Sequence, residues 1–317
     1  MTGLRFSYNV DGFSTREDFV ETCRRAERCG YDTVFAADHL GIPAPFPVLV
    51  AAAEATRRLR VGTLVLNVPF WNPALLAREV ATTDVLTGGR LELGLGAGHM
   101  KWEFDEAGIP WQPFGARADR LAETIEQLGR LFTQDGYPQQ EELRASRDLP
   151  ALRPVQRHGF GGVGPPLIVG GTSDRVLEIA GRSADVVSVS GIFQIGGQPP
   201  GTMRLGTPEE TEERVRYAAE RAGRRADRIE WHALVQLVVH TDDRRATAEQ
   251  LARRYGSEST PPELLLRSPF VFIGTTEQMA EQVLRNRERY GFTYYTVHGP
   301  YLDALAPVIE RVREIEG

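Results

Sequence analysis

An Asp-His pair follows an apolar run, Thr33–Ala36, of the kind that forms a buried β-strand. At the end of such a strand, the imidazole of His39 can serve as a general acid or base or stabilise charge, and Asp38 can orient it. A histidine can equally cap a strand end without any chemical role, so the residue types alone leave both readings open. Glu103, which lies beyond another apolar run at Leu91–Leu95, is a second acid/base candidate.

A glycine pair stands where a second predicted strand meets a helix. Gly170, Gly171 and Thr172 follow Leu167–Val169 and precede a helix that begins near Ser173. Glycine lets a backbone come close to a ligand, and the N–H groups at a helix N-terminus attract phosphate. A tight turn between strand and helix is the simpler alternative reading of the same residues.

A second glycine cluster, Gly94-Leu95-Gly96-Ala97-Gly98, follows the predicted fourth strand. It is not a dinucleotide-binding fingerprint, because no acidic partner closes a βαβ unit at the required distance. Three glycines in five residues indicate a backbone that approaches something flat. Trp102 can contact the same ligand or simply pack within the loop.

The sequence shows no pattern of metal ligands and no Gly-x-Ser-x-Gly nucleophile elbow. The six histidines are scattered, without an i,i+4 pair or a cysteine partner, at positions 39, 99, 158, 232, 240 and 298. We therefore expect no metal. Cys23 and Cys29 are predicted to be small core residues of one helix, because their Cβ vectors diverge too far for a disulfide.

Short β-rich runs alternate with longer segments of helical periodicity along almost the whole chain. Eight such units and a closing helix predict a (β/α)8 TIM barrel, α/β in class, with insertion loops and a single domain over residues 1–317. An open doubly wound sheet is the alternative. Active sites of such barrels lie where the strands end. Two segments outside the alternation, Gln134–Pro166 and Gly196–Gly206, are expected to cover the pocket.

Charge and hydropathy argue against two classes of function, nucleic-acid binding and membrane insertion. The net charge is −6 and no basic stripe is visible, which argues against nucleic-acid binding. No apolar stretch approaches the roughly 18 residues of a membrane span, and no signal peptide is recognisable. We expect a cytoplasmic protein without a membrane partner.

Several motifs together resemble those of the luciferase-like flavin and deazaflavin oxidoreductases. Gly88-Gly89-Arg90-Leu91 leads into Gly94–Gly98, and Glu103 is followed by Gly108-Ile109. Asp-His after the second strand, Pro-Pro-x-x-x-Gly-Gly from Pro165 to Gly171, and Ala-Asp-Val from Ala184 to Val186 complete the similarity, which covers nearly the whole chain. Asp84 departs from the pattern, where an apolar residue is expected.

The resemblance implies a ring cofactor in the barrel mouth and often a homodimer. The ring would lie over a bulge at Leu66, Asn67 and Val68, beside Gly96, Ala97, Gly98 and Trp102, with its phosphate near Gly170, Gly171, Thr172, Ser190 and Gly191. His39, steered by Asp38, and Glu103 would then be the catalytic candidates.

Asp38-His39 and Trp102-Glu103 resemble the motifs of the branch that uses coenzyme F-420. This coenzyme is a deazaflavin that carries hydrides and reacts poorly with oxygen. The resemblance thus implies hydride transfer to or from a small organic substrate, by alcohol oxidation or reduction of a C=C or C=N bond. An FMN-dependent two-component monooxygenase, fed by a separate cofactor reductase, is the leading alternative. A non-catalytic flavin-binding barrel is the second.

Overall fold

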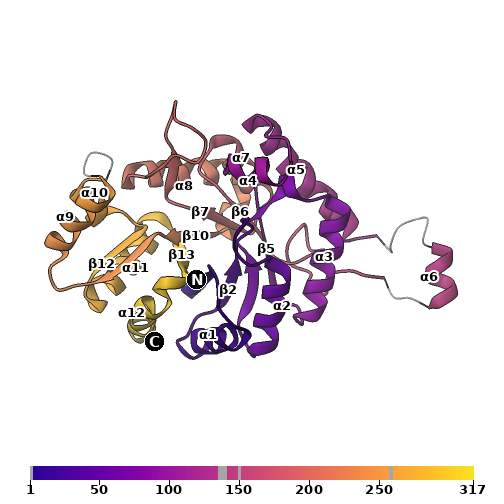
Figure 1. The fold of residues 1–317 in the computed structure, drawn as a ribbon, viewed down its shortest axis with the longest axis horizontal. Coiled ribbons are helices and arrows are strands. Elements are labelled where there is room, and N and C mark those ends of the chain that lie inside the picture. The colour runs from indigo at the N-terminus through magenta and orange to yellow at the C-terminus, as the bar shows by residue number, and fades with distance from the viewer. Residues whose placement is uncertain (1–2, 135–140, 149–150, 257–259) are drawn as a thin grey trace.

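The computed structural model describes residues 3–134, 141–148, 151–256 and 260–317. Parallel strands close into an eight-stranded barrel, which confirms the predicted fold class (Figure 1). The third barrel strand consists of two pieces, and pairing of β3 with β5 closes the ring. The barrel strands are β1 (Arg5–Val10), β2 (Thr33–Ala36), β3 (Arg60–Thr63) with β4 (Leu66–Asn67), β5 (Leu91–Gly96), β6 (Leu167–Gly170), β7 (Val186–Val189), β10 (Glu230–Val235) and β13 (Phe292–His298).

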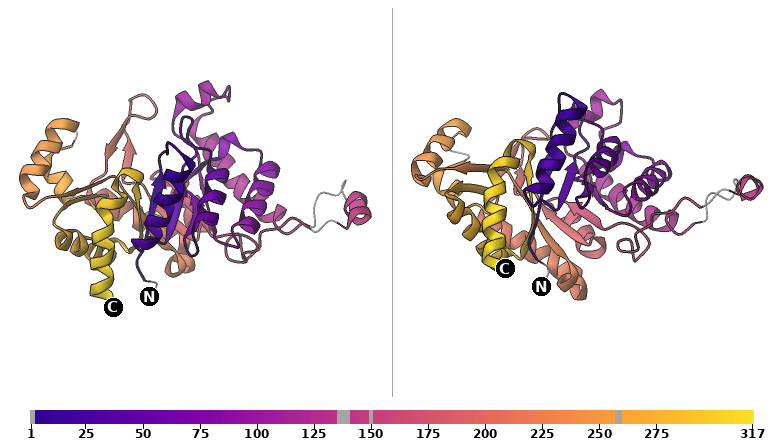
Figure 2. Two further views of the ribbon diagram at one scale, coloured as in Figure 1. Left: turned by 60° about the horizontal axis from the view of Figure 1, so that its bottom comes forward. Right: turned by 90° about the horizontal axis from the view of Figure 1, so that it is seen from below.

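Helices surround this barrel and join its strands (Figure 2). The main crossover helices and the closing helix are α1 (Arg16–Arg28), α2 (Pro45–Ala55), α3 (Pro73–Leu86), α5 (Phe114–Leu131), α7 (Asp174–Ser183), α8 (Pro208–Ala222), α11 (Thr276–Tyr290) and α12 (Leu302–Glu316). Shorter or inserted elements are α4 (Lys101–Glu106), α6 (Glu141–Arg147), β8 (Ile192–Gln194), β9 (Met203–Leu205), β11 (Leu237–His240), α9 (Arg244–Tyr255), α10 (Pro262–Arg267) and β12 (Val271–Gly274).

Local capping chemistry sets several helix starts. Thr207 and Thr275 each form a capping box with the residue three positions on, as the sequence predicts for Thr275. Asn72 caps α3 with Pro73 at the first position of the helix. Ser14 and Glu17 have the spacing of a capping box in the sequence, but Thr15 accepts the cap hydrogen bond of α1, from the backbone N–H of Asp18.

The apolar run at 230–240 predicts one long strand from the sequence, but the structure has two strands there. β10 belongs to the barrel, whereas β11 leaves it after Gln236 and pairs in parallel with β12. The backbone N–H of Gln236 donates to the carbonyl of Phe270 at the point of departure. Both pieces are buried and apolar, so periodicity alone gave no sign of the break. This small sheet carries α9 and α10 as an insertion ahead of α11.

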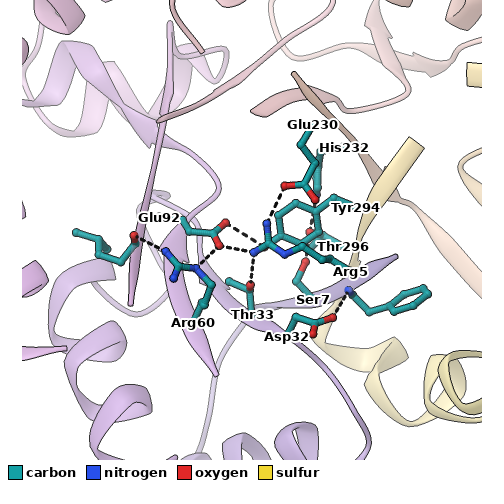
Figure 3. A network of polar contacts seen from close by, with 12 residues as sticks. Arg5, Ser7, Asp32, Thr33, Arg60, Glu92, Glu230, His232, Tyr294 and Thr296 are labelled. Carbon is teal, nitrogen blue, oxygen red and sulfur yellow. Dashed lines mark hydrogen bonds and ion pairs between the residues drawn. The ribbon is translucent and has the colours of Figure 1, made fainter. Parts of the chain in front are cut away.

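Charged side chains fill the N-terminal end of the barrel (Figure 3). Glu92 in β5 is 1% exposed and forms ion pairs with Arg5 and with Arg60, the latter at 2.6 Å. Arg5 also pairs with Glu230 at 2.7 Å and stacks over the ring of Tyr294. Burial favours the neutral acid, but the two arginines outweigh it and hold the pKa of Glu92 below its ordinary value. The charges of the arginines and glutamates at this end of the barrel therefore balance, and their side chains close it.

The segment between α5 and β6 lies at this closed end, not over the pocket. Asp84, fully buried in α3, accepts hydrogen bonds from the backbone N–H groups of Val155 (2.7 Å) and Gln156 (3.0 Å) and from the Gln156 side chain (2.6 Å). The Gln156 side chain in turn accepts one from Arg60. The expectation that 134–166 covers substrate is therefore wrong for its described part, since the loop joins a helix to the start of a strand. Residues 135–140 and 149–150 lie outside the described residues. Asp84, the departure from the family pattern, anchors this loop.

Within the described ranges, no helix has both the length and the apolar character that crossing a bilayer requires.

Candidate active site

One large pocket opens at the C-terminal ends of the barrel strands. Its volume is about 730 Å³, within the range of small-molecule and cofactor sites. The lining residues come from the ends of nearly all barrel strands and from the loops after them. They include Asp38, His39, Leu66, Asn67, Gly96, Ala97, Gly98, Glu103, Gly170, Gly171, Thr172, Ser190, Gln236 and His298.

A histidine–carboxylate pair lies on one wall. The Nδ1 of His39 is 2.9 Å from Oε1 of Glu103, and the backbone N–H of Leu40 donates to the same oxygen at 3.1 Å. Glu103 is 1% exposed, whereas the side chain of His39 remains 36% exposed to the pocket. Because a carboxylate only accepts, Nδ1 carries the proton in this bond and Nε2 is left for a ligand. Helix α4 and the loop after β2 thus bring the two residues together.

Asp38 does not orient His39 through a hydrogen bond, which corrects the expectation from the sequence. Its Oδ2 accepts instead from the backbone N–H of Asn67 at 3.0 Å and from Nε1 of Trp71 at 2.8 Å. Burial raises the pKa of Asp38, and these two donors partly oppose that rise. Asp38 therefore ties the end of β2 to the bulge at β4 and acts on His39 only through its charge.

Two further basic groups extend the wall. The ring of His99 meets that of His39 edge to face, with centroids 5.5 Å apart. The protein atoms packed around the ring and the charges of His39 and Arg117 lower the pKa of His99, although the residue as a whole is exposed. His99 is therefore neutral at pH 7. Arg117, in the first turn of α5, is 6% exposed and also lines the pocket.

Glycine is required where the loop after β5 meets the bulge. At Gly98, φ is +78°, and a Cβ would lie 2.4 Å from Oδ1 of Asn67 and 2.9 Å from Cζ of Phe104. Asn67 Oδ1 is buried and, within the part of the chain that the structure describes, has no hydrogen-bond partner. A flat ring with N–H or O–H groups beside Asn67 would fit both observations, as expected for the ring site at Leu66 and Asn67.

The opposite wall meets the N-terminus of α7. Gly170, Gly171, Thr172 and Ser173 line the pocket there. Ser173 is the N-cap residue, yet its side chain makes no capping bond, and its Oγ is buried without a partner in the described ranges. Free N–H groups at a helix start and an unsatisfied hydroxyl suit an anion such as a phosphate. The residues present thus fit both the ring and the phosphate of a flavin-type cofactor.

Three of the expected cofactor residues do not line the pocket. Trp102 is 51% exposed on α4, and Val68 is fully buried beneath the bulge. Gly191 has a φ of +71° and packs against Phe270, so close that a Cβ would lie 2.2 Å from the ring. Residues next to them in the sequence line the pocket wall instead. Of the two expected loops, the one at 196–206 does reach the pocket, through Gln198, Pro200 and Met203.

The sequence analysis missed the aromatic and cationic wall at the start of α5, which consists of Trp111, Phe114 and Arg117. One signal could have found it. Arg117 lies four residues before Leu121, on the face of α5 that carries its buried side chains. An arginine on an apolar helix face requires an explanation, and a pocket provides one.

Comparison with known proteins agrees with this geometry. The sequence model of the family described as luciferase-like monooxygenase matches residues 7–294. An F420-dependent glucose-6-phosphate dehydrogenase of Kribbella flavida is 28% identical, over 94% of this chain and 92% of its own. The oxygenase component of a flavin-dependent trigonelline monooxygenase of Acinetobacter baylyi is 27% identical over 55% of this chain. The chain spans less than half the length of several other curated relatives, 43% in one case.

The fold is also that of known structures. A coenzyme F420 dependent tetrahydromethanopterin reductase from Methanopyrus kandleri superposes with a TM-score of 0.70 at 18% identity, over 99% of each chain. Because the family model covers most of the chain, this protein belongs to the luciferase-like monooxygenase family of oxidoreductases.

Proposed function

We propose that the chain is a coenzyme F-420-dependent oxidoreductase that transfers a hydride between the deazaflavin and a small organic substrate. The observation that carries the proposal is the His39–Glu103 pair, at 2.9 Å, on the wall next to the expected ring site. The relative that aligns over 94% of this chain is F420-dependent by name, which favours this cofactor over FMN.

Leu66, Asn67, Gly96, Ala97 and Gly98 would hold the ring, and the start of α7 would hold the phosphate. When bound, the coenzyme supplies a carbon that accepts or donates a hydride. His39 accepts or donates the accompanying proton at Nε2. In alcohol oxidation it takes the hydroxyl proton while the hydride leaves the carbinol carbon, and in a reduction it returns a proton to the substrate.

Glu103 is a positioning residue in this scheme. Its carboxylate fixes the ring orientation and tautomer of His39 and stabilises the imidazolium that forms when Nε2 takes a proton. Because Glu103 is nearly inaccessible, the charge pair is screened little by water.

The second candidate is an FMN-dependent monooxygenase, supported by the trigonelline monooxygenase relative. Here the pocket would hold reduced FMN and admit O₂. Dimer formation, a cytoplasmic location and a partner reductase stay predictions.

Titration of the protein with coenzyme F-420 and with FMN, followed by fluorescence quenching, separates the candidates. We expect F-420 to bind at least tenfold more tightly. Tighter binding of FMN, with oxygen uptake on addition of reduced FMN, would overturn the proposal. Binding of either cofactor without turnover of any substrate would favour the non-catalytic barrel.

The role of His39 is tested with His39→Asn, once a substrate is found. Positioned acid–base groups contribute roughly 10²- to 10⁴-fold to rate, so kcat should fall by that order with little change in coenzyme affinity. His240→Asn is the matched control, because His240 lies at the end of β11 and bonds the carbonyl of Ala304. Turnover close to that of the control would exclude this role for His39.

A further inference from the structure

The guanidinium of Arg117 lies at the pocket wall without a counter-charge. Its Nη1 donates to the carbonyl of Gln112, and its plane stacks on the ring of Trp111, 3.6 Å from the centroid. Its Nε is buried and has no hydrogen-bond partner among the described residues. Burial lowers the pKa of Arg117, and no acidic group among the described residues acts against this. A buried cation with unused donors is costly unless something pairs with it.

The acidic residues of the pocket are already engaged elsewhere. Asp38 accepts from Asn67 and Trp71, and Glu103 accepts from His39 and Leu40. In the described part of the chain, Arg117 is also the one arginine or lysine that lines the pocket. Its charge is therefore the fixed positive charge available to a ligand there.

The neighbours of Arg117 suit an anion rather than a cation. His99 lies close enough for the charge of Arg117 to lower its pKa, and its imidazole forms no hydrogen bond with the described residues. Trp111 holds the guanidinium plane in place, so a ligand does not have to order a flexible side chain. The aromatic rings of Trp111 and Phe114 line the pocket beside the guanidinium.

We propose that Arg117 is the recognition site for an oxyanion, a carboxylate or phosphate, carried by the molecule that enters this pocket. The free Nε–H and the unused Nη donors would form charge-assisted hydrogen bonds to two oxygens of that group. If the oxyanion belongs to the substrate, the substrate is an organic acid or a phosphate ester, an assignment that rests on the proposed function. The anion site itself does not depend on that function.

The test uses inorganic phosphate and acetate as probes. The melting temperature of the full chain is followed against probe concentration, at constant ionic strength balanced with chloride, and yields an apparent Kd. Wild type and Arg130→Met, the same substitution at an exposed position of α5, should show equal, saturable stabilisation. Arg117→Met should weaken it at least tenfold, and Arg117→Lys, which keeps the charge, by less. An equal response in Arg117→Met and wild type, or no saturable response in wild type, overturns the proposal.

A second arm, with saturating coenzyme F-420, identifies the source of the anion. If phosphate still binds in an Arg117-dependent way, the site serves the substrate. If the coenzyme displaces phosphate and binds Arg117→Met at least tenfold more weakly, the site serves an anionic group of the coenzyme. If F-420 does not bind at all while phosphate binding still requires Arg117, the proposed function fails and the anion site stands.

Discussion

Acid pH should weaken the fold through His232, which lies inside the barrel on β10 and is fully buried. Its Nδ1 is 2.7 Å from Oγ of Ser188, and its Nε2 is 2.6 Å from Oγ1 of Thr296. Burial lowers its pKa to about 3; the charge of Glu92 opposes that shift, and the charge of Arg5 adds to it. The neutral imidazole is therefore the form that the folded barrel accepts.

The sign and size of this change in the free energy of unfolding follow from the different proton affinities of the folded and unfolded states. The pKa of His232 in the folded state lies below the value of about 6.5 in the unfolded chain, so the unfolded state binds the proton first. The contribution of neutral His232 to the free energy of unfolding is fully present above about pH 6.5 and is lost progressively as pH falls toward 3. Between pH 7 and pH 5 this group alone should remove about 2 kcal/mol of the free energy of unfolding.

Urea unfolding followed by circular dichroism, at pH 7 and pH 5, measures this loss. The variant His232→Gln keeps polar atoms in place but cannot titrate, so its loss over the same interval should be smaller by about 2 kcal/mol. Carboxylates that titrate in both proteins cancel in the comparison. His240→Gln removes an exposed histidine and should behave as wild type. If His232→Gln loses as much stability as wild type, His232 is not the acid-sensitive group.

Three other outcomes are expected. Glu103→Gln should lower kcat and shift its pH profile while leaving the melting temperature within a few degrees, and an unchanged profile would count against its positioning role. Asp84→Ala removes the acceptor of three hydrogen bonds and should cost about 2–4 kcal/mol in urea unfolding, whereas Asp119→Ala, at an exposed ion pair, should cost under about 1 kcal/mol. Gly98→Ala should weaken cofactor binding at least tenfold, because its Cβ would displace Asn67; unaltered fluorescence quenching would contradict this.

The sequence predicted most of the architecture because its strongest signals are local. Helix caps such as Thr275 with Gln278 involve residues three apart, and the strand-to-helix alternation needs no knowledge of distant contacts. Strand ends were also enough to place His39, Glu103 and Gly170 at one end of the barrel. The break at Gln236 could not be predicted from the sequence, because a strand that leaves the barrel to pair with another strand is as apolar as one that stays in it.

Pairing within the site could not be predicted in the same way. Adjacency in sequence suggested Asp38 as the partner of His39, but neighbouring side chains of extended backbone point in different directions. The partner is Glu103, 64 positions away, and only the barrel brings the two together. Similarly, the role of Asp84 depends on a loop about 70 residues later in the chain.

The two ends of the barrel differ in how completely their buried polar atoms are paired. At the N-terminal end, Glu92 is held between Arg5 and Arg60, although Oε1 of Glu230 lacks a partner among the described residues. At the C-terminal end lie Oδ1 of Asn67, Nε of Arg117 and Oγ of Ser173, three of the six buried side-chain atoms without a partner among the described residues. The pocket is lined by only 29 of the 317 residues, so this share is far above an even distribution. Each such atom costs roughly 1–3 kcal/mol when left unpaired. A fold retains such atoms where a ligand pairs with them, so we expect the proposed ring, oxyanion and phosphate to bind at these three positions.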